Sequence, residues 1–149
     1  MTYHIAELNI GKFRFPIDDS RMAGFVSQLE AINALADNAP GFVWRLQDET
    51  GNATAIRPFP DDMLAVNFSV WESIEALFQY TYSSDHVKLL RSRKEWFEHM
   101  TEHYFCMWWI PAGHIPTLTE AKERLEAIRR DGPTAYAFNF KERFEAPRG

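Results

Sequence analysis

The sequence predicts an α+β fold of the ferredoxin-like type, in which an antiparallel sheet carries helices on one face. Some segments alternate apolar and polar residues with period two, as strands do, while others place apolar residues at helical spacing. Their order along the chain is β-α-β-β-α-α-β-α, a split βαβ arrangement with extra helices. The 149 residues fit one domain, residues 1–149, with a core at about 3–132 and a tail at 133–149.

Strands are predicted at residues 3–11, 42–49, 63–71 and 103–112. The first and third alternate most clearly, and the second is rich in β-formers and closed by a turn-like TGNAT. The fourth, HYFCMWWIPA, ends at a proline. Because successive residues of a strand point to opposite faces, adjacent tryptophans in the fourth strand must face opposite ways.

Helices are predicted from cap residues and apolar stripes. The first spans about residues 18–38, and its stripe consists of Met22, Phe25, Val26, Leu29, Ile32 and Ala36. A second helix begins near Ser73, whose hydroxyl can cap it. Residues 83–85, Ser-Ser-Asp, are cap candidates for a third helix that continues to about Met100.

The last predicted helix begins with a capping box. Thr117 and Glu120 have the spacing in which the hydroxyl of the first residue caps the helix, and the Gly-Pro pair at 132–133 marks its end. The tail then offers a short edge strand at residues 138–140, where Phe-Asn-Phe favours β-structure.

The predicted sheet has one apolar face and one face of mixed polarity. The mixed face combines a carboxylate, amides and a hydroxyl with large apolar side chains: Glu7, Asn9, Asn67 and Ser69 lie among Tyr3, Ile5 and Trp71. Such a face is too apolar for open solvent and too polar for a dry core. We expect the sheet of a second subunit to cover it and to leave a partly polar cavity.

Composition excludes several classes of function. A net charge of −5 argues against nucleic acid as a partner. The first residues lack the pattern of a secretion signal, and no apolar run is long enough for a membrane helix. Cys106 is the single cysteine, so no internal disulfide can form. We therefore expect a cytoplasmic protein without a membrane partner. Aromatic residues make up 15% of the chain and must fill a core, an interface or a pocket.

Much of the chain also resembles a known family. The segments PGFVWRLQDETGNAT, NFSVWESIEALFQYTYSSDH, RSRKEWFEHM and MWWIPAGHIPTLTEAKERLE resemble the domain-of-unknown-function family numbered 3291, within the dimeric α+β barrel superfamily. VWESIEAL followed by SSDH is similar, more distantly, to antibiotic-biosynthesis monooxygenases. The resemblance implies a homodimer whose two sheets form a barrel, with a pocket in each subunit between its sheet and its helices. It does not specify a reaction, because the superfamily contains oxygenases, haem-dependent enzymes, isomerases and ligand binders.

His86 is the candidate catalytic residue. In a helix beginning near residue 84, an inward stripe would consist of His86, Leu90, Arg93, Phe97 and Met100. A histidine at the pocket wall can accept a proton from a phenol or hydroquinone and so activate it towards oxygen. The alternative is a core histidine that donates a hydrogen bond to a backbone carbonyl or to Tyr82.

The other site candidates are aromatic or polar side chains. Tryptophans and Tyr82 can stack on a flat ligand, although such residues also fill cores and interfaces. An arginine can bind an anionic or carbonyl group, or it can pair with an acid such as Glu7. Asn67 can orient a substrate oxygen or belong to an interface network. The predicted substrate-binding residues are Trp44, Arg45, Asn67, Trp71, Tyr82 and Trp108.

No metal site is predicted. His99–His103 reads H-x-x-E-H, a pattern of zinc proteases, but that site requires a continuous helix and a β-rich segment follows at once. No nucleotide-binding or serine-hydrolase motif is present, so no cofactor is predicted. Haem remains an alternative cofactor, because a single histidine can ligate its iron. His86 is again the candidate ligand.

Two classes of function follow from these observations. The leading one is a monooxygenase-like enzyme that acts on a hydrophobic or aromatic substrate, which itself reduces oxygen, without a nucleotide cofactor. The alternative is a noncatalytic dimer whose pocket holds a small ligand or haem. A third reading, in which the aromatic surfaces serve only dimerisation, has no ligand.

Overall fold

In the computed structural model, residues 2–47, 63–83 and 93–147 are described, and they form a curled antiparallel sheet with helices packed against it. β1 (Tyr3–Phe13) is central. β3 (Leu64–Trp71) pairs with one edge of β1, and β2 (Phe42–Arg45) pairs with the outer edge of β3. The other edge of β1 pairs with β5 (Phe105–Pro111) and, near its end, with β4 (Phe97–Glu98). The predicted ferredoxin-like α+β fold is confirmed.

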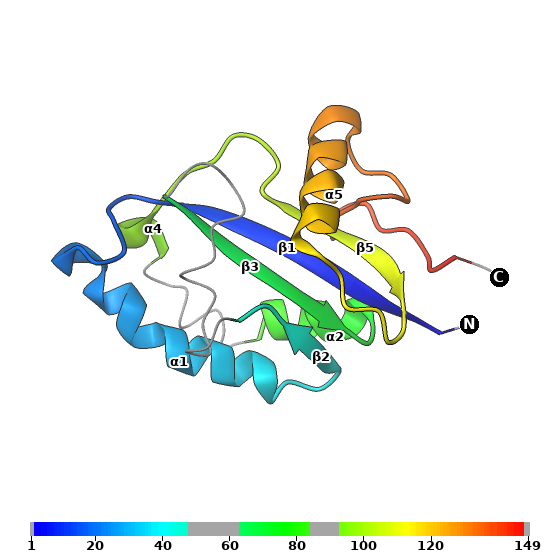
Figure 1. Ribbon diagram of the computed structural model, residues 1–149, viewed down its shortest axis with the longest axis horizontal. Coiled ribbons are helices and arrows are strands. Elements are labelled where there is room, and N and C mark those ends of the chain that lie inside the picture. The colour runs from blue at the N-terminus through cyan, green and yellow to red at the C-terminus, as the bar shows by residue number, and fades with distance from the viewer. Residues whose placement is uncertain (1, 48–62, 84–92, 148–149) are drawn as a thin grey trace.

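The helices lie on both faces of this sheet, whereas the sequence predicted helices on one face only. A short 3-10 turn, η1 (Ser20–Met22), leads into α1 (Ala23–Asp37), and α2 (Ile74–Thr81) follows β3. Residues of both helices pack against Ile5, Trp71, Phe13 and their neighbours. α5 (Leu118–Asp131) packs on the opposite face, so Figure 1 shows it well separated from α1.

Two faces of the sheet are therefore distinct, as the alternation predicts. The apolar face, under α5, carries Ala6, Leu8, Ile10, Val66, Phe68, Val70, Cys106, Trp108 and Ile110. The mixed face, under α1 and α2, carries Ile5, Glu7, Ser69, Trp71 and Met107. The expectation that a second subunit's sheet would cover the mixed face is wrong, because helices of the same chain cover it.

The predicted caps of α2 and α5 are confirmed. The hydroxyl of Ser73 accepts a hydrogen bond from the backbone N–H of Ala76, at 3.1 Å. The hydroxyl of Thr117 does the same for Glu120, also at 3.1 Å. Each bond satisfies a backbone donor that the first turn of a helix leaves without an internal partner.

The predicted third helix does not reach Met100. Residues 84–92 lie outside the described part of the chain, and α4 (Arg93–Trp96) ends before Phe97. Phe97 instead pairs in β4 with Phe13, and their rings stack at 5.4 Å. β1 extends to Phe13, beyond its predicted end. The backbone pairing and the ring contact of Phe13 hold Phe97 in the sheet.

The C-terminal tail makes only part of its predicted edge strand. Phe138 forms a single bridge with Met107, in which each backbone N–H donates to the other's carbonyl, at 3.0 and 2.8 Å. Phe138 is fully buried and stabilises the outer edge of β5. In the described ranges, no helix has the length and apolar character needed to cross a membrane.

Candidate functional site

Strand register brings the polar residues of the mixed face together. Glu7 of β1 lies opposite Ser69 of β3, which in turn lies opposite Arg45 of β2. The next row pairs Asn9 with Asn67. Positions two apart on a strand share a face, so these side chains project to the same side as α1 and α2.

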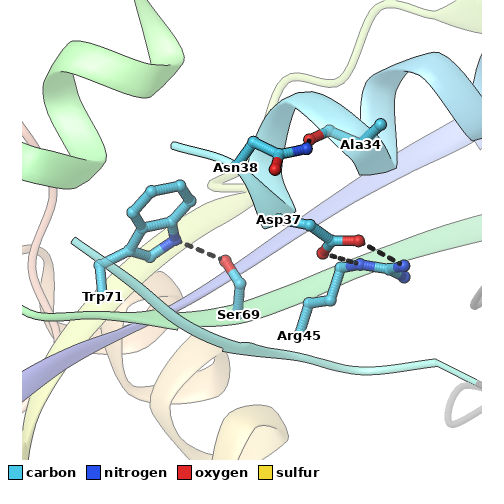
Figure 2. Close-up of polar contacts among 6 residues, drawn as sticks. All are labelled: Ala34, Asp37, Asn38, Arg45, Ser69 and Trp71. Carbon is cyan, nitrogen blue, oxygen red and sulfur yellow. Dashed lines mark hydrogen bonds and ion pairs between the residues drawn. The ribbon is translucent and has the colours of Figure 1, made fainter. Parts of the chain in front are cut away.

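A buried hydrogen-bond chain leads to Glu7. The hydroxyl of Ser69 donates to Oε1 of Glu7 at 2.6 Å, and the indole N–H of Trp71 donates to Oγ of Ser69 at 2.9 Å. Figure 2 shows the Trp71 indole directed at Ser69. These hydrogen bonds run from Trp71 through Ser69 to Glu7, because an indole N–H can only donate.

Burial changes the chemistry of the Glu7 carboxyl. Glu7 is 5% exposed, and desolvation raises its pKa from 4.5 to about 8, although the hydrogen bond from Ser69 opposes that rise. A carboxyl of this kind is neutral in most molecules at pH 7 and ionises just above it. Proton transfer is most efficient when the pKa of the group lies near the working pH.

Tyr80 of α2 packs against Trp71, the first donor of these hydrogen bonds. Its ring stacks on Trp71, with the centroids 4.9 Å apart. Burial and the nearby Glu7 carboxylate raise the pKa of the Tyr80 hydroxyl well above its usual value. Tyr80 therefore stays a neutral phenol when Glu7 ionises.

Glu7 lies on the wall of a pocket of about 710 Å³. The pocket lies between the end of α2, the segment before β5 and the C-terminal tail. Its lining includes Asn9, Asn67, Leu77, Tyr80, Thr81, Tyr82, residues 100–105, Arg129, Asn139, Phe140 and Lys141. Phe140 stacks on Phe105 at 5.2 Å and meets the ring of Tyr82 edge-on at 6.0 Å. The pocket thus has aromatic walls and a few polar groups, as small-molecule sites do.

A larger hollow, of about 970 Å³, lies between α1 and α2. Small and apolar side chains dominate its lining, including Ala31, Ala34, Leu35, Ala39 and Ala76. Tyr80 is its one ionisable residue among those described. Without an acid or base that titrates near neutral pH, this hollow is a poorer candidate for catalysis than the pocket at Glu7.

The structure brings together some of the residues predicted for the site. Asn67 and Tyr82 line the Glu7 pocket, and Trp71 contacts it through Ser69 and Tyr80. His86, the predicted catalytic residue, lies outside the described residues.

Arg45 is near the site but engaged elsewhere. Its Nε donates to Oδ1 of Asp37, the last residue of α1, at 2.8 Å, and its Nη2 donates to Oδ2 at 3.3 Å. Figure 2 shows this two-point pair beside Ser69. The partner is Asp37, where the sequence had suggested an acid such as Glu7. Arg45 therefore fixes the end of α1 to β2.

Trp44 and Trp108 do not join the other candidates. Both lie on the apolar face and contact Phe68. The centroid of the Phe68 ring lies 5.3 Å from that of Trp44 and 6.0 Å from that of Trp108. The indole N–H of Trp108 donates to Glu120 at 2.9 Å. Trp109 packs on the mixed face, so the predicted opposite orientation of the two adjacent tryptophans is confirmed.

No metal site is found among residues 2–47, 63–83 and 93–147, where no group of at least three His, Cys, Asp or Glu is placed to hold an ion. The segment 99–103 is not helical, so it lacks the continuous helix that the H-x-x-E-H pattern of zinc proteases requires. Cys106 is fully buried on the apolar face, and burial raises the pKa of its thiol to about 12. It is not a nucleophile at neutral pH.

Sequence reasoning missed part of the site. It placed Glu7 on the mixed face without giving it a catalytic role, and it did not select Tyr80, His103 or Arg129. The sequence feature that could have identified the site is Glu7 itself, because it is an acidic residue within a predicted strand whose other residues are mostly apolar. The other residues come from distant segments, and only tertiary structure shows that they line one pocket.

Comparison with known proteins finds one family and several distant structures. A family described as "Domain of unknown function (DUF3291)" matches residues 4–149. SnoaB, a cofactor-independent oxygenase from Streptomyces nogalater, is 15% identical, with a TM-score of 0.47 over 75% of this chain and 95% of that chain. A dabb family protein with a ferredoxin-like fold from Mesorhizobium loti is 17% identical, with a TM-score of 0.47 over 75% of this chain and 100% of that chain. No curated protein matches.

Proposed function

This chain belongs to the DUF3291 family, and we propose that it is a monooxygenase-like small-molecule enzyme in which Glu7 accepts a proton from a hydroxyl group of a hydrophobic, aromatic substrate. One observation carries the proposal: Glu7 is a buried carboxyl with a pKa of about 8 on the wall of an aromatic pocket. Asn9 and Asn67 lie beside it and are suited to hydrogen-bond the oxygens of a substrate.

The raised pKa makes Glu7 a competent base for a phenol. A phenol such as tyrosine has an ordinary pKa of about 10, so transfer to a carboxylate of pKa 4.5 costs roughly 7 kcal/mol. Transfer to Glu7, with its pKa of about 8, costs roughly 3 kcal/mol. Ser69 supplies a hydrogen bond that favours the ionised form of Glu7 and fixes its orientation.

An ionised electron-rich ring can donate electrons to oxygen directly. In the proposed reaction the C–H carbon para to the ionised hydroxyl takes one atom of O₂ and becomes a carbonyl, so that the phenol becomes a quinone, and the second atom of O₂ leaves as water with the hydrogen of that carbon. The substrate supplies every electron, so this reaction requires no bound cofactor. Glu7 takes the first proton and later returns it to the departing oxygen.

His86, predicted from the sequence as the proton acceptor, remains proposed as a second proton carrier in this reaction. If it has that role, H86A should remove turnover without changing the oligomeric state. Measuring H86A beside E7Q separates the two residues, since only the residue that accepts the rate-determining proton sets the pH at which turnover rises.

Oxygen uptake is the experiment that tests the proposal. We expect the wild-type protein to consume oxygen with at least one member of a panel of phenols, hydroquinones and anthrones, and turnover to rise with pH until about pH 8. E7Q should lose roughly 100-fold or more of this rate. E98Q makes the same change at an exposed position of β4 and should retain the rate. Ligand binding without oxygen uptake, or full activity in E7Q, would contradict the proposal.

We also propose that two copies associate through the sheet, as the family resemblance implies. The chain has a mass of 17.4 kDa, so light scattering should give about 35 kDa for the dimer. A mass that stays near 17.4 kDa at micromolar concentration would contradict it.

A further inference from the structure

Cationic side chains lie around part of the Glu7 pocket. Arg129 and Lys141 line it, from α5 and the tail. Glu102 lies beside them and forms an ion pair with Arg129. The remaining carboxyl of the described lining, Glu7, is mostly neutral at pH 7. The described lining of the pocket therefore has a net charge of about +1 at pH 7, from Arg129 and Lys141 against Glu102.

The guanidinium of Arg129 is bonded at one nitrogen and lacks a hydrogen-bond partner at another among the described residues. Its Nε donates to the backbone carbonyl of His103 at 2.8 Å and lies 3.3 Å from Oε2 of Glu102. Its Nη2 is buried and has no hydrogen-bond partner among the described residues. Leaving a buried donor of a charged group unpaired is costly, so such a group is usually satisfied by a ligand or water.

The backbone around Arg129 belongs to a helix packed against the sheet. It lies in the last turns of α5, between Ile128 and Arg130, and Ile128 is fully buried against the sheet. A guanidinium held on a packed helix loses little freedom when it binds, which favours recognition of a planar anion.

We propose that the substrate is an aromatic hydroxy acid, whose carboxylate binds Arg129 with support from Lys141 while its hydroxyl meets Glu7. This inference rests on the proposed function, since the hydroxyl is the group that Glu7 deprotonates. A monoanion fits better than a dianion such as a phosphate, because Glu102 offsets one of the two permanent cations.

Glu102 competes with this carboxylate for Arg129. Its side chain is 62% exposed, and its oxygen lies 3.3 Å from the Nε of Arg129. An exposed ion pair of this kind contributes little to stability, so a ligand can displace it. Removing the charge of Glu102 should therefore tighten carboxylate binding, whereas removing that of Arg129 should weaken it.

The test compares two fluorescent probes, 2-naphthol and 6-hydroxy-2-naphthoate, which differ only in a carboxylate. In fluorescence titrations of the full-length protein at pH 7, we expect the carboxylate probe to bind roughly tenfold tighter, the typical gain from a charged hydrogen bond. R129Q should abolish that preference and retain 2-naphthol binding. R130Q, at the 70% exposed next residue, should leave the preference unchanged. E102Q should increase it.

The outcomes separate this inference from the proposed function. Equal affinity of the wild-type protein for the two probes, or an R129Q that weakens both probes equally, would overturn the carboxylate site. Full oxygen uptake by E7Q with an intact carboxylate preference would overturn the proposed function and leave the anion site standing. If R129Q does not fold by circular dichroism, K141Q replaces it: the preference should fall in K141Q and in high salt, and a preference unchanged in both would overturn the inference.

Discussion

Replacing Glu7 with Gln should change how the stability of the protein depends on pH. Gln keeps the shape of the side chain and still accepts the hydrogen bond from Ser69, but it cannot ionise. The pKa of Glu7 is raised from 4.5 to about 8 in the folded state. The folded protein therefore retains a proton that the unfolded chain releases above pH 4.5, so the free energy of unfolding falls with rising pH throughout this window.

The size of the effect follows from the same two values. Stability should fall by about 1.4 kcal/mol per pH unit between the two pKa values and level off above about pH 8. The wild-type protein should thus lose about 3.5 kcal/mol relative to E7Q between pH 5 and pH 8.

Urea unfolding at fixed protein concentration, at each half unit from pH 5 to pH 9, provides the assay. The difference in free energy of unfolding between E7Q and the wild type removes the contributions of all other titrating groups. E98Q, at an exposed position on β4, should follow the wild-type curve. A constant difference between E7Q and the wild type over this range would refute the reasoning, since it would mean that Glu7 has an ordinary pKa.

Three further substitutions test particular contacts. S69A removes the hydrogen bond that favours ionised Glu7 and should move the pH at which stability levels off above 8, as urea curves would show; an unchanged or lower value would contradict the bond's role. G41A should destabilise the protein by about 1–3 kcal/mol more than G132A, because both have positive φ but only the Cβ at Gly41 would meet another atom, at 2.5 Å. Equal losses in thermal unfolding would contradict this. T117A should cost about 1 kcal/mol through loss of the helix cap, and no change in urea unfolding would show that the cap is not needed.

Much of the fold is predictable because it depends on local patterns. Period-two alternation located β1 and β3, and hydroxyl caps located the starts of α2 and α5 within one residue. The pairing of Phe97 with Phe13 was not predictable, since a tertiary contact ends the helix that local spacing favoured. The placement of α5 opposite α1 and α2 also depends on packing, because an apolar stripe does not specify which face it will cover.

The candidate site was predictable only in part. Alternation correctly grouped Glu7 and Asn67 on a face of mixed polarity. Trp44 and Arg45, both expected in the pocket, are neighbours in a strand and so point to opposite faces. An irregular register between Phe42 and Trp44 then sends Trp44 to the apolar face. The burial that raises the pKa of Glu7 depends on tertiary packing, and strand alternation alone does not reveal it.

The most direct test of the role of Glu7 is a ¹³C NMR titration of the glutamate carboxyl groups in the wild-type protein and E7Q, with and without 2-naphthol. We expect a resonance, absent from E7Q, that titrates near pH 8, and we expect 2-naphthol to shift this resonance and its titration midpoint. A Glu7 carboxyl that titrates near pH 4.5, or one that saturating 2-naphthol leaves unchanged, would contradict the claim that Glu7 is the proton-accepting group of a ligand pocket.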